Sequence, residues 1–277
     1  MEHKLNVAVV QMVSGADVDA NLAQLEELLT PLASKQLDLI VLPEMFLCLG
    51  VKDQVSIAKN RCTESDVIST LAKWGERLNA YIVAGSIPML DETVSNKVRA
   101  ASILFSPQAH LVTRYDKIHL FDVDVADNKG SYRESDTFTP GKEPVTAYVN
   151  GHAMGMSVCY DLRFPELYQH YQKEACELIT VPSAFTYQTG EAHWEILLRA
   201  RAIETQCFVL AANQGGVHDD GRETWGHSMI VHPNGQILAE VKEAGPGVAV
   251  ATLDFDELKD LHLKMPLLKH KRLSGHH

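Results

Sequence analysis

Short apolar runs alternate with longer segments of helical periodicity along most of the chain. The continuous apolar runs at 5–12, 37–44 and 80–88 predict strands buried on both faces, because a half-exposed strand would alternate apolar and polar positions. Leucines at helical spacing predict a helix over 21–33, which Pro31 should end or bend. The pattern therefore predicts strands and helices in alternation.

Hairpins interrupt this alternation at two places. Residues 98–106 and 110–117 flank a turn at Pro107, and Asn150-Gly151 marks a second hairpin turn. The other expected elements are helices at 65–80, 164–173, 190–206 and 254–262, and strands at 177–182, 207–212, 225–231, 236–240 and 246–252.

Alternation mixed with hairpins predicts mixed sheets with helices on their outer faces, in a layered α/β sandwich. The chain contains no evident linker, low-complexity tract or repeat of fixed period, so we expect one domain over 1–277. A polar loop rich in Asp, Gly and Ser covers 121–143. Loops of that length in a compact domain are usually functional or disordered.

Composition and charge restrict the partners. The chain has 277 residues, 45% hydrophobic and 22% charged, which is typical of a soluble globular protein. We expect no membrane span, because no apolar run approaches eighteen residues, and no signal peptide, because the N-terminus lacks that layout. The net charge of −11 argues against a nucleic-acid or anionic-membrane partner.

Cysteine and histidine usage points to a cytoplasmic protein without a metal or cofactor. The five cysteines are odd in number and widely spaced, which suits a reducing compartment better than a disulfide framework. They offer no zinc spacing, and the thirteen histidines include no H-E-x-x-H. Glycine-rich nucleotide-binding motifs are also missing from the sequence, so we expect no cofactor.

Three apolar runs end at residues with reactive side chains. Glu44 follows "LIVLP", Lys117 follows "LVTRYD", and Cys159 follows "GMSV". Together, a carboxylate can act as base and acid for a thiol, and an ammonium can stabilise the thiolate and an oxyanion. Each residue also has an ordinary interpretation, as a solvated charge or a buried small side chain. The residues alone therefore indicate only a candidate thiol hydrolase.

The segments around these residues resemble a known family. "VLPEMF", "RYDKIHLFDVDV" and "CYDLRFPELY" are similar to the three signature segments of the nitrilase superfamily of carbon–nitrogen hydrolases, and the resemblance runs from "VAVVQM" to "MPLLKHKR". It implies a four-layer αββα sandwich. It also implies a triad of Glu44 as general base, Lys117 as oxyanion stabiliser and Cys159 as nucleophile.

The resemblance adds two further groups to this expected site. Glu134, in "YRESDTFTPG", matches a second family glutamate that positions the lysine and the substrate, so the loop 121–143 would carry it into the pocket. The alternative for Glu134 is a solvated loop charge. The backbone N–H of Tyr160 would be the second oxyanion donor.

The resemblance also indicates a branch of the family. Tyr160 follows the cysteine where true nitrilases have Trp, and residues 181–216 look most like the Nit-type amidases. Ser183 in "PSAF" favours the branch acting on deaminated glutathione over the ω-amidases, which more often have Gly there. The expected substrate-binding residues are Tyr160, Arg163, Ser183, Phe185 and Thr186, and a longer pocket would be lined by Tyr187, Gln188, His193 or Trp194.

Arg163 has two interpretations. Related carbamoyl-amino-acid hydrolases place a carboxylate-binding arginine at this position, and a guanidinium is the natural bidentate partner of a carboxylate. The alternative is a structural ion pair with Glu166 or Asp161.

The expected function is hydrolysis of a primary amide or ω-amide of a small carboxylate-bearing metabolite through a cysteine thioester, with deaminated glutathione as favoured substrate. The alternatives are an ω-amidase acting on α-ketoglutaramate and an N-carbamoyl amino acid hydrolase. A nitrilase-like interaction protein without catalysis is the alternative of another class. Family members pair through helices, so a homodimer or higher homo-oligomer is expected.

Overall fold

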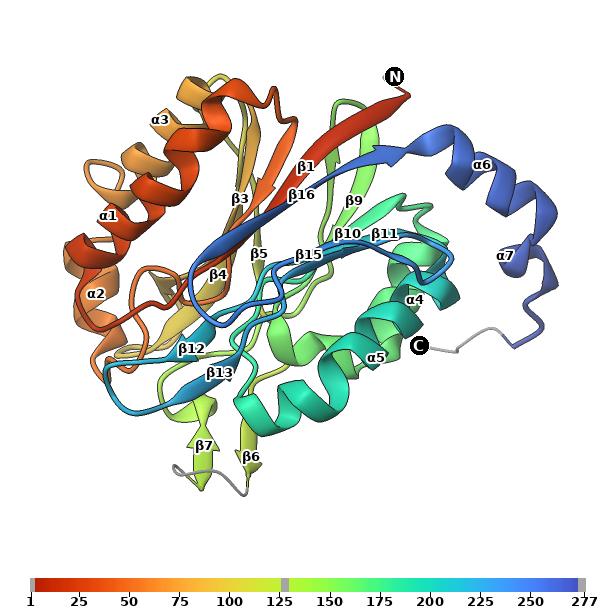
Figure 1. Ribbon diagram of the computed structural model, residues 1–277. Coiled ribbons are helices and arrows are strands. Elements are labelled where there is room, and N and C mark those ends of the chain that lie inside the picture. Colours follow the sequence, from red (N-terminus) through yellow and green to blue (C-terminus); the bar gives the residue numbers. More distant parts are fainter. Residues whose placement is uncertain (1–2, 126–129, 274–277) are drawn as a thin grey trace.

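The protein is described by a computed structural model over residues 3–125 and 130–273. Its centre is a pair of six-stranded sheets packed against one another (Figure 1). The first sheet has the strand order β16 (Gly247–Asp254), β1 (Lys4–Gln11), β2 (Leu39–Val41), β3 (Tyr81–Leu90), β4 (Val98–Phe105), β5 (Leu111–Asp116). The second has the order β15 (Ile237–Glu240), β14 (Met229–Val231), β11 (Phe208–Ala211), β10 (Leu178–Thr180), β9 (His152–Met156), β8 (Thr146–Val149).

Both sheets are mixed and contain a run of parallel strands. β1, β2 and β3 are parallel neighbours in the first sheet, and β9, β10 and β11 are parallel neighbours in the second. β16 completes the first sheet by pairing antiparallel with β1, from Lys4↔Asp254 to Gln11↔Gly247. Parallel strands present their carboxyl ends at one edge of a sheet, where α/β proteins commonly place their binding sites.

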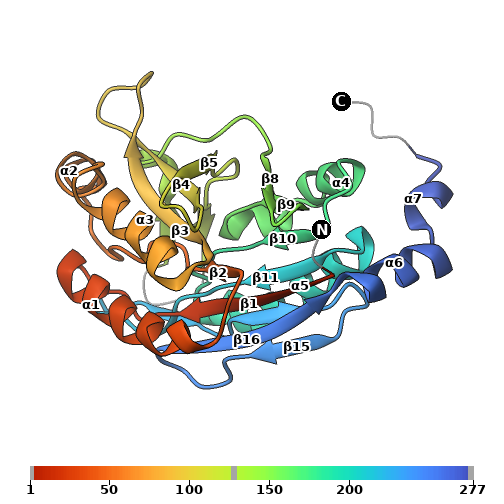
Figure 2. The same ribbon diagram turned by 90° about the horizontal axis from the view of Figure 1, so that it is seen from above.

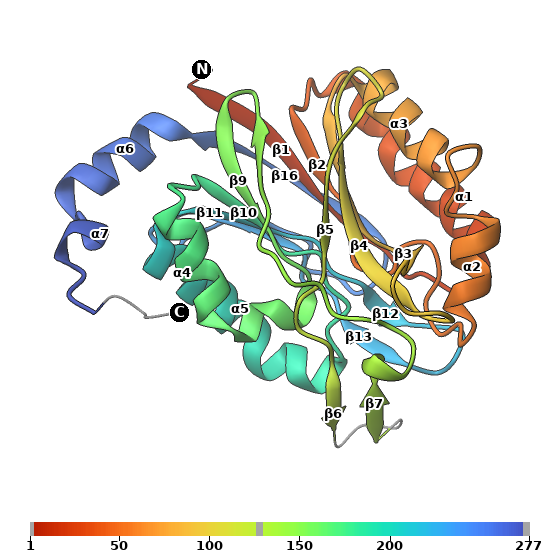
Figure 3. The ribbon, with the colours of Figure 1, turned by 180° about the vertical axis from the view of Figure 1, so that it is seen from behind.

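Helices cover the outer face of each sheet, which gives four layers (Figures 1 and 3). On the first sheet lie α1 (Val18–Leu29), which continues into the 3₁₀ turn η1 (Thr30–Ser34), α2 (Gln54–Asn60) and α3 (Val67–Leu78). On the second sheet lie α4 (Pro165–Lys173) and α5 (Tyr187–Thr205). At the C-terminal end, α6 (Phe255–Lys264) and α7 (Leu267–His270) extend beyond the sandwich (Figure 2). The expected αββα fold is confirmed.

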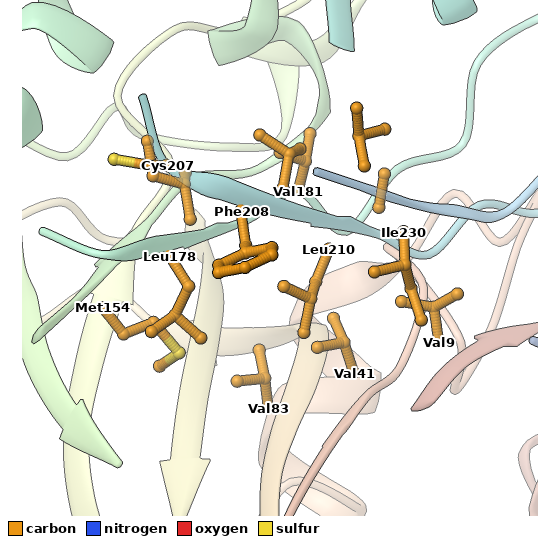
Figure 4. Packing of buried hydrophobic residues seen from close by; sticks show 14 of the residues in the cluster. Val9, Val41, Val83, Met154, Leu178, Val181, Cys207, Phe208, Leu210 and Ile230 are labelled. Carbon is orange, nitrogen blue, oxygen red and sulfur yellow. The ribbon is translucent and has the colours of Figure 1, made fainter. Parts of the chain in front are cut away.

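The strands of the first sheet contribute side chains to two hydrophobic cores, one on each face of the sheet, which explains their unbroken apolar sequences. In β1, Val9 packs between the sheets, whereas the next residue, Val10, packs beneath the helices with residues of α1 and α3. β2 and β3 divide their side chains in the same way. Figure 4 shows Val9 and Val41 of the first sheet in one core with Phe208 and Leu210 of the second.

Most of the expected elements are present with small changes at their ends. Pro31 lies in η1, so the helix expected over 21–33 ends at Leu29. The strand expected at 225–231 is wrong as a single element. It is divided into β13 (Glu223–Trp225), paired in a small hairpin with β12 (Gly215–Val217), and β14 of the second sheet. Gly226 separates them at φ +73, where a Cβ would lie 3.0 Å from the Gln11 side chain.

The loop expected over 121–143 contains a two-stranded ribbon and a 3₁₀ turn. β6 (Asp122–Asp124) pairs with β7 (Ser131–Arg133), and η2 (Glu134–Asp136) follows directly. Residues 126–129 of this loop lie outside the described part of the chain. The ribbon projects from one end of the sandwich in Figure 1. Of the helices within 3–125 and 130–273, none is long and apolar enough to cross a membrane.

Candidate active site

Three strand ends bring Glu44, Lys117 and Cys159 to one place. Glu44 follows β2, Lys117 follows β5 directly, and Cys159 opens the 3₁₀ turn η3 (Cys159–Arg163) after β9. The Nζ atom of Lys117 lies 2.8 Å from Oε1 of Glu44 and 2.8 Å from Oε2 of Glu134. All four side chains line one cavity. The structure thus brings together the four residues that the sequence analysis selected.

A bulge in β3 places the chain that carries Glu44. The pairing of β3 with β4 shifts between Ala84 and Ile87, and Gly85 lies inside this shift at φ +21. A Cβ on Gly85 would lie 1.8 Å from the carbonyl oxygen of Pro43, so only glycine allows the two segments to approach this closely. Ser86 then accepts a hydrogen bond of 3.1 Å from the N–H of Met45. Glu44 is therefore fixed on both sides by its neighbours.

Cys159 occupies a sharp backbone turn. Its φ is +49, which is uncommon for a residue with a side chain, and its N–H donates to the carbonyl of Pro182 at 2.8 Å. Such conformations persist only where the surroundings hold them, and they cluster at functional sites. Here the surroundings include Asp161, whose carboxylate accepts a 2.8 Å hydrogen bond from the N–H of Val158.

Asp161 also ties the cysteine turn to the segment that carries the lysine. Its buried carboxylate accepts hydrogen bonds from the Tyr115 hydroxyl at 2.7 Å and from the His119 N–H at 3.0 Å. The Nδ1 atom of His119 lies 2.7 Å from the same carboxylate. Tyr115 and His119 stand on either side of Lys117, so the positions of the ammonium and the thiol depend on one another.

The charge on Lys117 is stabilised by two carboxylates inside the protein. Burial opposes that charge, but Glu134 and then Glu44 outweigh it, so the pKa of Lys117 lies well above its usual value. Burial raises the pKa of Glu134, against the lowering effect of Lys117. Oε2 of Glu134, the oxygen 2.8 Å from the lysine, also accepts a 2.6 Å hydrogen bond from the N–H of Phe121. The lysine is therefore charged and held in a single orientation.

The surroundings of Cys159 favour its thiol form over the thiolate. Burial, followed by the negative charge of Glu44, raises its pKa well above the usual value, and Lys117 only partly offsets this. A thiol beside a carboxylate can pass its proton directly as it attacks, so it needs no preformed thiolate.

The cavity beside Cys159 has a volume of about 520 Å³. Tyr160, Arg163, Phe185 and Thr186 line it, as the sequence analysis expected. Ser183 lies outside its wall: the side chain is fully buried, and its hydroxyl donates back to the carbonyl of Val181 at 3.3 Å. None of the residues expected to line a longer pocket is in the wall, namely Tyr187, Gln188, His193 and Trp194.

Arg163 lines the cavity and does not form the ion pair of its alternative interpretation. Its guanidinium lies 3.2 Å from Nδ1 of His193 and 5.2 Å from the ring centroid of Phe185. Asp161 bonds Tyr115 and His119 instead, and no carboxylate of the described residues lies within 4.0 Å of Arg163. The geometry favours the interpretation of Arg163 as a group that binds an anion.

Several wall residues were missed by the sequence analysis. The ribbon and turn after Phe121 contribute a large part of the wall, although only Glu134 was selected from them, and the β13 side contributes Arg222. The additional wall residues include Met45, Val51, Lys52, Gln54, Phe121, Tyr132, Arg133, Phe138, Thr189 and Arg222. These residues lie in segments without a recognisable sequence motif, so their position in the cavity wall could be found only from the fold. Among the described residues, no group of three or more His, Cys, Asp or Glu is placed to hold a metal ion.

Comparison with known proteins agrees with this fold. Residues 6–262 match the carbon-nitrogen hydrolase family. The deaminated glutathione amidase of Yersinia enterocolitica is 41% identical over 267 residues, which are 96% of this chain and 93% of that protein.

Two solved structures are similar throughout this chain. The Caenorhabditis elegans NitFhit protein has a TM-score of 0.90 and 31% identity, over 98% of this chain and 65% of its own. Saccharomyces cerevisiae Nit3, a member of branch 10 of the nitrilase superfamily, has a TM-score of 0.85 and 28% identity, over 99% of this chain and 98% of its own. This chain belongs to the carbon–nitrogen hydrolases, in the amidase branch of the nitrilase superfamily.

Proposed function

We propose that this chain hydrolyses deaminated glutathione through a thioester on Cys159. One observation carries the proposal: Lys117, held by Glu44 and Glu134, lines the same cavity as the Cys159 thiol. A base, a fixed cation and a nucleophile at one cavity match the needs of amide hydrolysis. The choice of substrate rests on the Yersinia relative, whose name is deaminated glutathione amidase and which matches nearly the whole chain.

In the first half-reaction, the Cys159 sulfur attacks the amide carbonyl while Glu44 takes the thiol proton. The carbonyl oxygen becomes an oxyanion, which the Lys117 ammonium and the backbone N–H of Tyr160 stabilise. Glu44 then gives its proton to the leaving nitrogen, the C–N bond breaks, and an amine departs. The acyl group remains on Cys159 as a thioester.

In the second half-reaction, Glu44 takes a proton from water, and the hydroxide attacks the thioester carbonyl. The same oxyanion donors stabilise the second tetrahedral intermediate, the C–S bond breaks, and the thiol recovers its proton. The acyl group leaves as a carboxylate. Glu134 acts as a positioning residue, because it holds Lys117 and touches none of the reacting atoms.

Deaminated glutathione is glutathione with an oxo group in place of its α-amino group, so both of its amides are secondary. The leaving group is therefore an amine, and not the ammonia that a primary amide would release. The amide nearer the oxo acid separates a dicarboxylic oxo acid from a dipeptide. Arg163 is suited to bind the carboxylate of the oxo acid, since it faces the cavity without a carboxylate partner.

The proposal is tested by measuring kcat/KM for four substrates: deaminated glutathione, α-ketoglutaramate, an N-carbamoyl amino acid and glutamine. The assay measures the primary amine released from deaminated glutathione and the ammonia released from the other three substrates. We expect a preference of at least tenfold for deaminated glutathione, about 1.4 kcal/mol in transition-state binding. Preference for α-ketoglutaramate would indicate the ω-amidase alternative, and preference for the carbamoyl compound the N-carbamoyl hydrolase.

The Cys159→Ala protein is the control for the mechanism. Removal of the nucleophile should reduce turnover to the detection limit while the circular dichroism spectrum and melting temperature stay near those of the unaltered protein. Full activity in Cys159→Ala would refute the role of Cys159. Inactivity of the unaltered protein on all four substrates would instead support the interaction-protein alternative.

Three broader properties belong to the same proposal. We propose a single domain over 1–277, supported by the core that both sheets share. A homodimer paired through helices is supported by apolar side chains exposed on α5, such as Ile196 at 69% and Ile203 at 47%. A cytoplasmic location without a nucleic-acid partner is supported by five free cysteines and the net charge of −11.

A further inference from the structure

A second arginine, Arg222, lines the cavity with one ion-pair partner, Asp220 at 3.3 Å, and with donors that make no hydrogen bond to the described residues. Arg222 precedes β13, and its side chain is 14% exposed. Its only side-chain hydrogen bond within the described residues runs from Nη2 to Asp220 at 3.3 Å, near the upper limit for such a bond. Its Nε is buried and has no partner among those residues. A guanidinium in this state attracts a further anion.

The surroundings of Arg222 suit a planar carboxylate. The guanidinium carbon lies 5.7 Å from the ring centroid of Tyr132, which holds the group by a cation–π contact. Nη1 makes no hydrogen bond to the described residues, so the guanidinium of this lining residue keeps donors for a further acceptor. By contrast, Arg133 in the same wall donates to two carbonyls and to Asp124.

The two available arginines lie on different parts of the wall. Arg163 belongs to η3, the short turn that Cys159 opens, so it stays beside the acyl group on the sulfur. Arg222 lies with the ribbon residues Tyr132 and Arg133, in the part of the wall that also includes the exposed Ser131. Since Arg163 is the arginine beside the acyl group, Arg222 is the arginine that remains for the leaving group.

We propose that Arg222 binds the carboxylate at the far end of the leaving group, and so selects amides that carry a carboxylate on both sides of the bond that breaks. This inference rests on the proposed function. Deaminated glutathione has such a second carboxylate on its glycine, whereas α-ketoglutaramate and carbamoyl amino acids release ammonia and have none there. Arg222 is then a specificity-determining residue for the reaction.

The test compares two substrates that differ in one charge: deaminated glutathione and its C-terminal carboxamide. For the unaltered protein we expect kcat/KM to be at least tenfold higher for the acid. In Arg222→Gln this acid-to-amide ratio should fall to about 1, and in Arg222→Lys it should take an intermediate value. A residue that only supported the fold would lower both rates together and leave the ratio unchanged.

Two variants in the same wall serve as matched controls. Arg133→Gln removes a guanidinium that already has protein partners, and Lys52→Gln removes an exposed cation. Both should keep the ratio of the unaltered protein. If Arg222→Gln does not fold, as judged by circular dichroism, Arg222→Lys decides the matter by its change in ratio.

The possible results distinguish failure of this inference from failure of the proposed function. Three results would refute the role of Arg222 and leave the proposed function intact. They are an acid-to-amide ratio near 1 in the unaltered protein, an unchanged ratio in both Arg222 variants, and a fall of the ratio to about 1 in Lys52→Gln. Failure of the unaltered protein to hydrolyse either compound would refute the proposed substrate and this inference together.

Discussion

The hydroxyl of Tyr115 donates a 2.7 Å hydrogen bond to the carboxylate of Asp161, and this contact joins the two sheets at the candidate active site. Tyr115 is on β5 of the first sheet, and Asp161 is in the turn that follows β9 of the second. Since Lys117 and Cys159 are each two residues away from this contact, it sets their relative position. Lys117 and Cys159 are thus aligned by a hydrogen bond between two other residues.

Asp161→Asn should therefore reduce both stability and activity. The buried carboxylate accepts from Val158, Tyr115 and His119, and an amide NH₂ would face at least one of these donors. We expect a loss of about 3 kcal/mol in the free energy of unfolding, because a buried donor is left unpaired. Urea unfolding and kcat measure the two effects. Asp260→Asn, on the exposed part of α6, is the control and should change neither; an equal loss there would contradict this role.

Glu134→Gln should lower kcat/KM by about a hundredfold, equivalent to about 2.7 kcal/mol. Both oxygens of Glu134 bond the Lys117 ammonium, at 2.8 and 3.0 Å, and its charge is the foremost of the groups that raise the pKa of Lys117. A glutamine keeps one acceptor and loses the charge. Steady-state kinetics measure the loss, and a change of less than threefold would show that Glu44 alone holds the lysine.

The same residue predicts a pH dependence. Burial raises the pKa of Glu134 above the ordinary 4.5, so the folded protein binds this proton more readily than the unfolded chain does. As pH falls towards 4.5, protonation of Glu134 should add to stability while it removes the charge that holds Lys117. Activity should then decline at a pH above that of an ordinary carboxyl group, before the protein unfolds. Parallel kcat/KM and urea-unfolding profiles test this, and simultaneous loss of both would contradict it.

Gly85→Ala should displace Glu44 and destabilise the fold by about 1–3 kcal/mol, the usual range for overpacking. The added Cβ would lie 1.8 Å from the Pro43 carbonyl oxygen, which is backbone and cannot rotate away. Thermal unfolding and kcat are the measurements. Gly130→Ala serves as control, because a Cβ there meets nothing within 4 Å although φ is also positive. Similar effects at both glycines would indicate backbone strain rather than the contact with Pro43.

Cys207→Ala should have a lower free energy of unfolding than the unaltered protein, and this difference should become smaller at alkaline pH. Burial raises the pKa of Cys207 from 9.0 to about 12, so above pH 9.0 the unfolded chain loses this proton while the folded protein keeps it. The thiol therefore costs the folded state about 1.4 kcal/mol for each pH unit above 9.0. Urea unfolding under reducing conditions between pH 8 and 10.5 measures the difference. Ser102→Ala, a buried site without a titrating side chain, should show a constant difference; a constant deficit for Cys207→Ala would refute the prediction.

The sequence predicts the layered fold and the central site residues because both leave strong local patterns. Strands buried on both faces have continuous apolar runs, and the segments around Glu44, Lys117 and Cys159 match a family. The position of Ser183 could not be predicted, since its orientation depends on how β10 ends against β11. The contacts of Arg222 and Asp161 could not be predicted either, because their partners are distant in the chain.

The pairing of β1 with β16 has a consequence for folding. The two strands lie near opposite ends of this sequence, and the first sheet is complete only when β16 pairs with all eight residues from Lys4 to Gln11. Glu44 and Lys117 directly follow or lie close after two strands of that sheet, β2 and β5. A sheet that carries two residues of the candidate site is therefore closed by strands distant in the sequence, so its folding depends on long-range contacts.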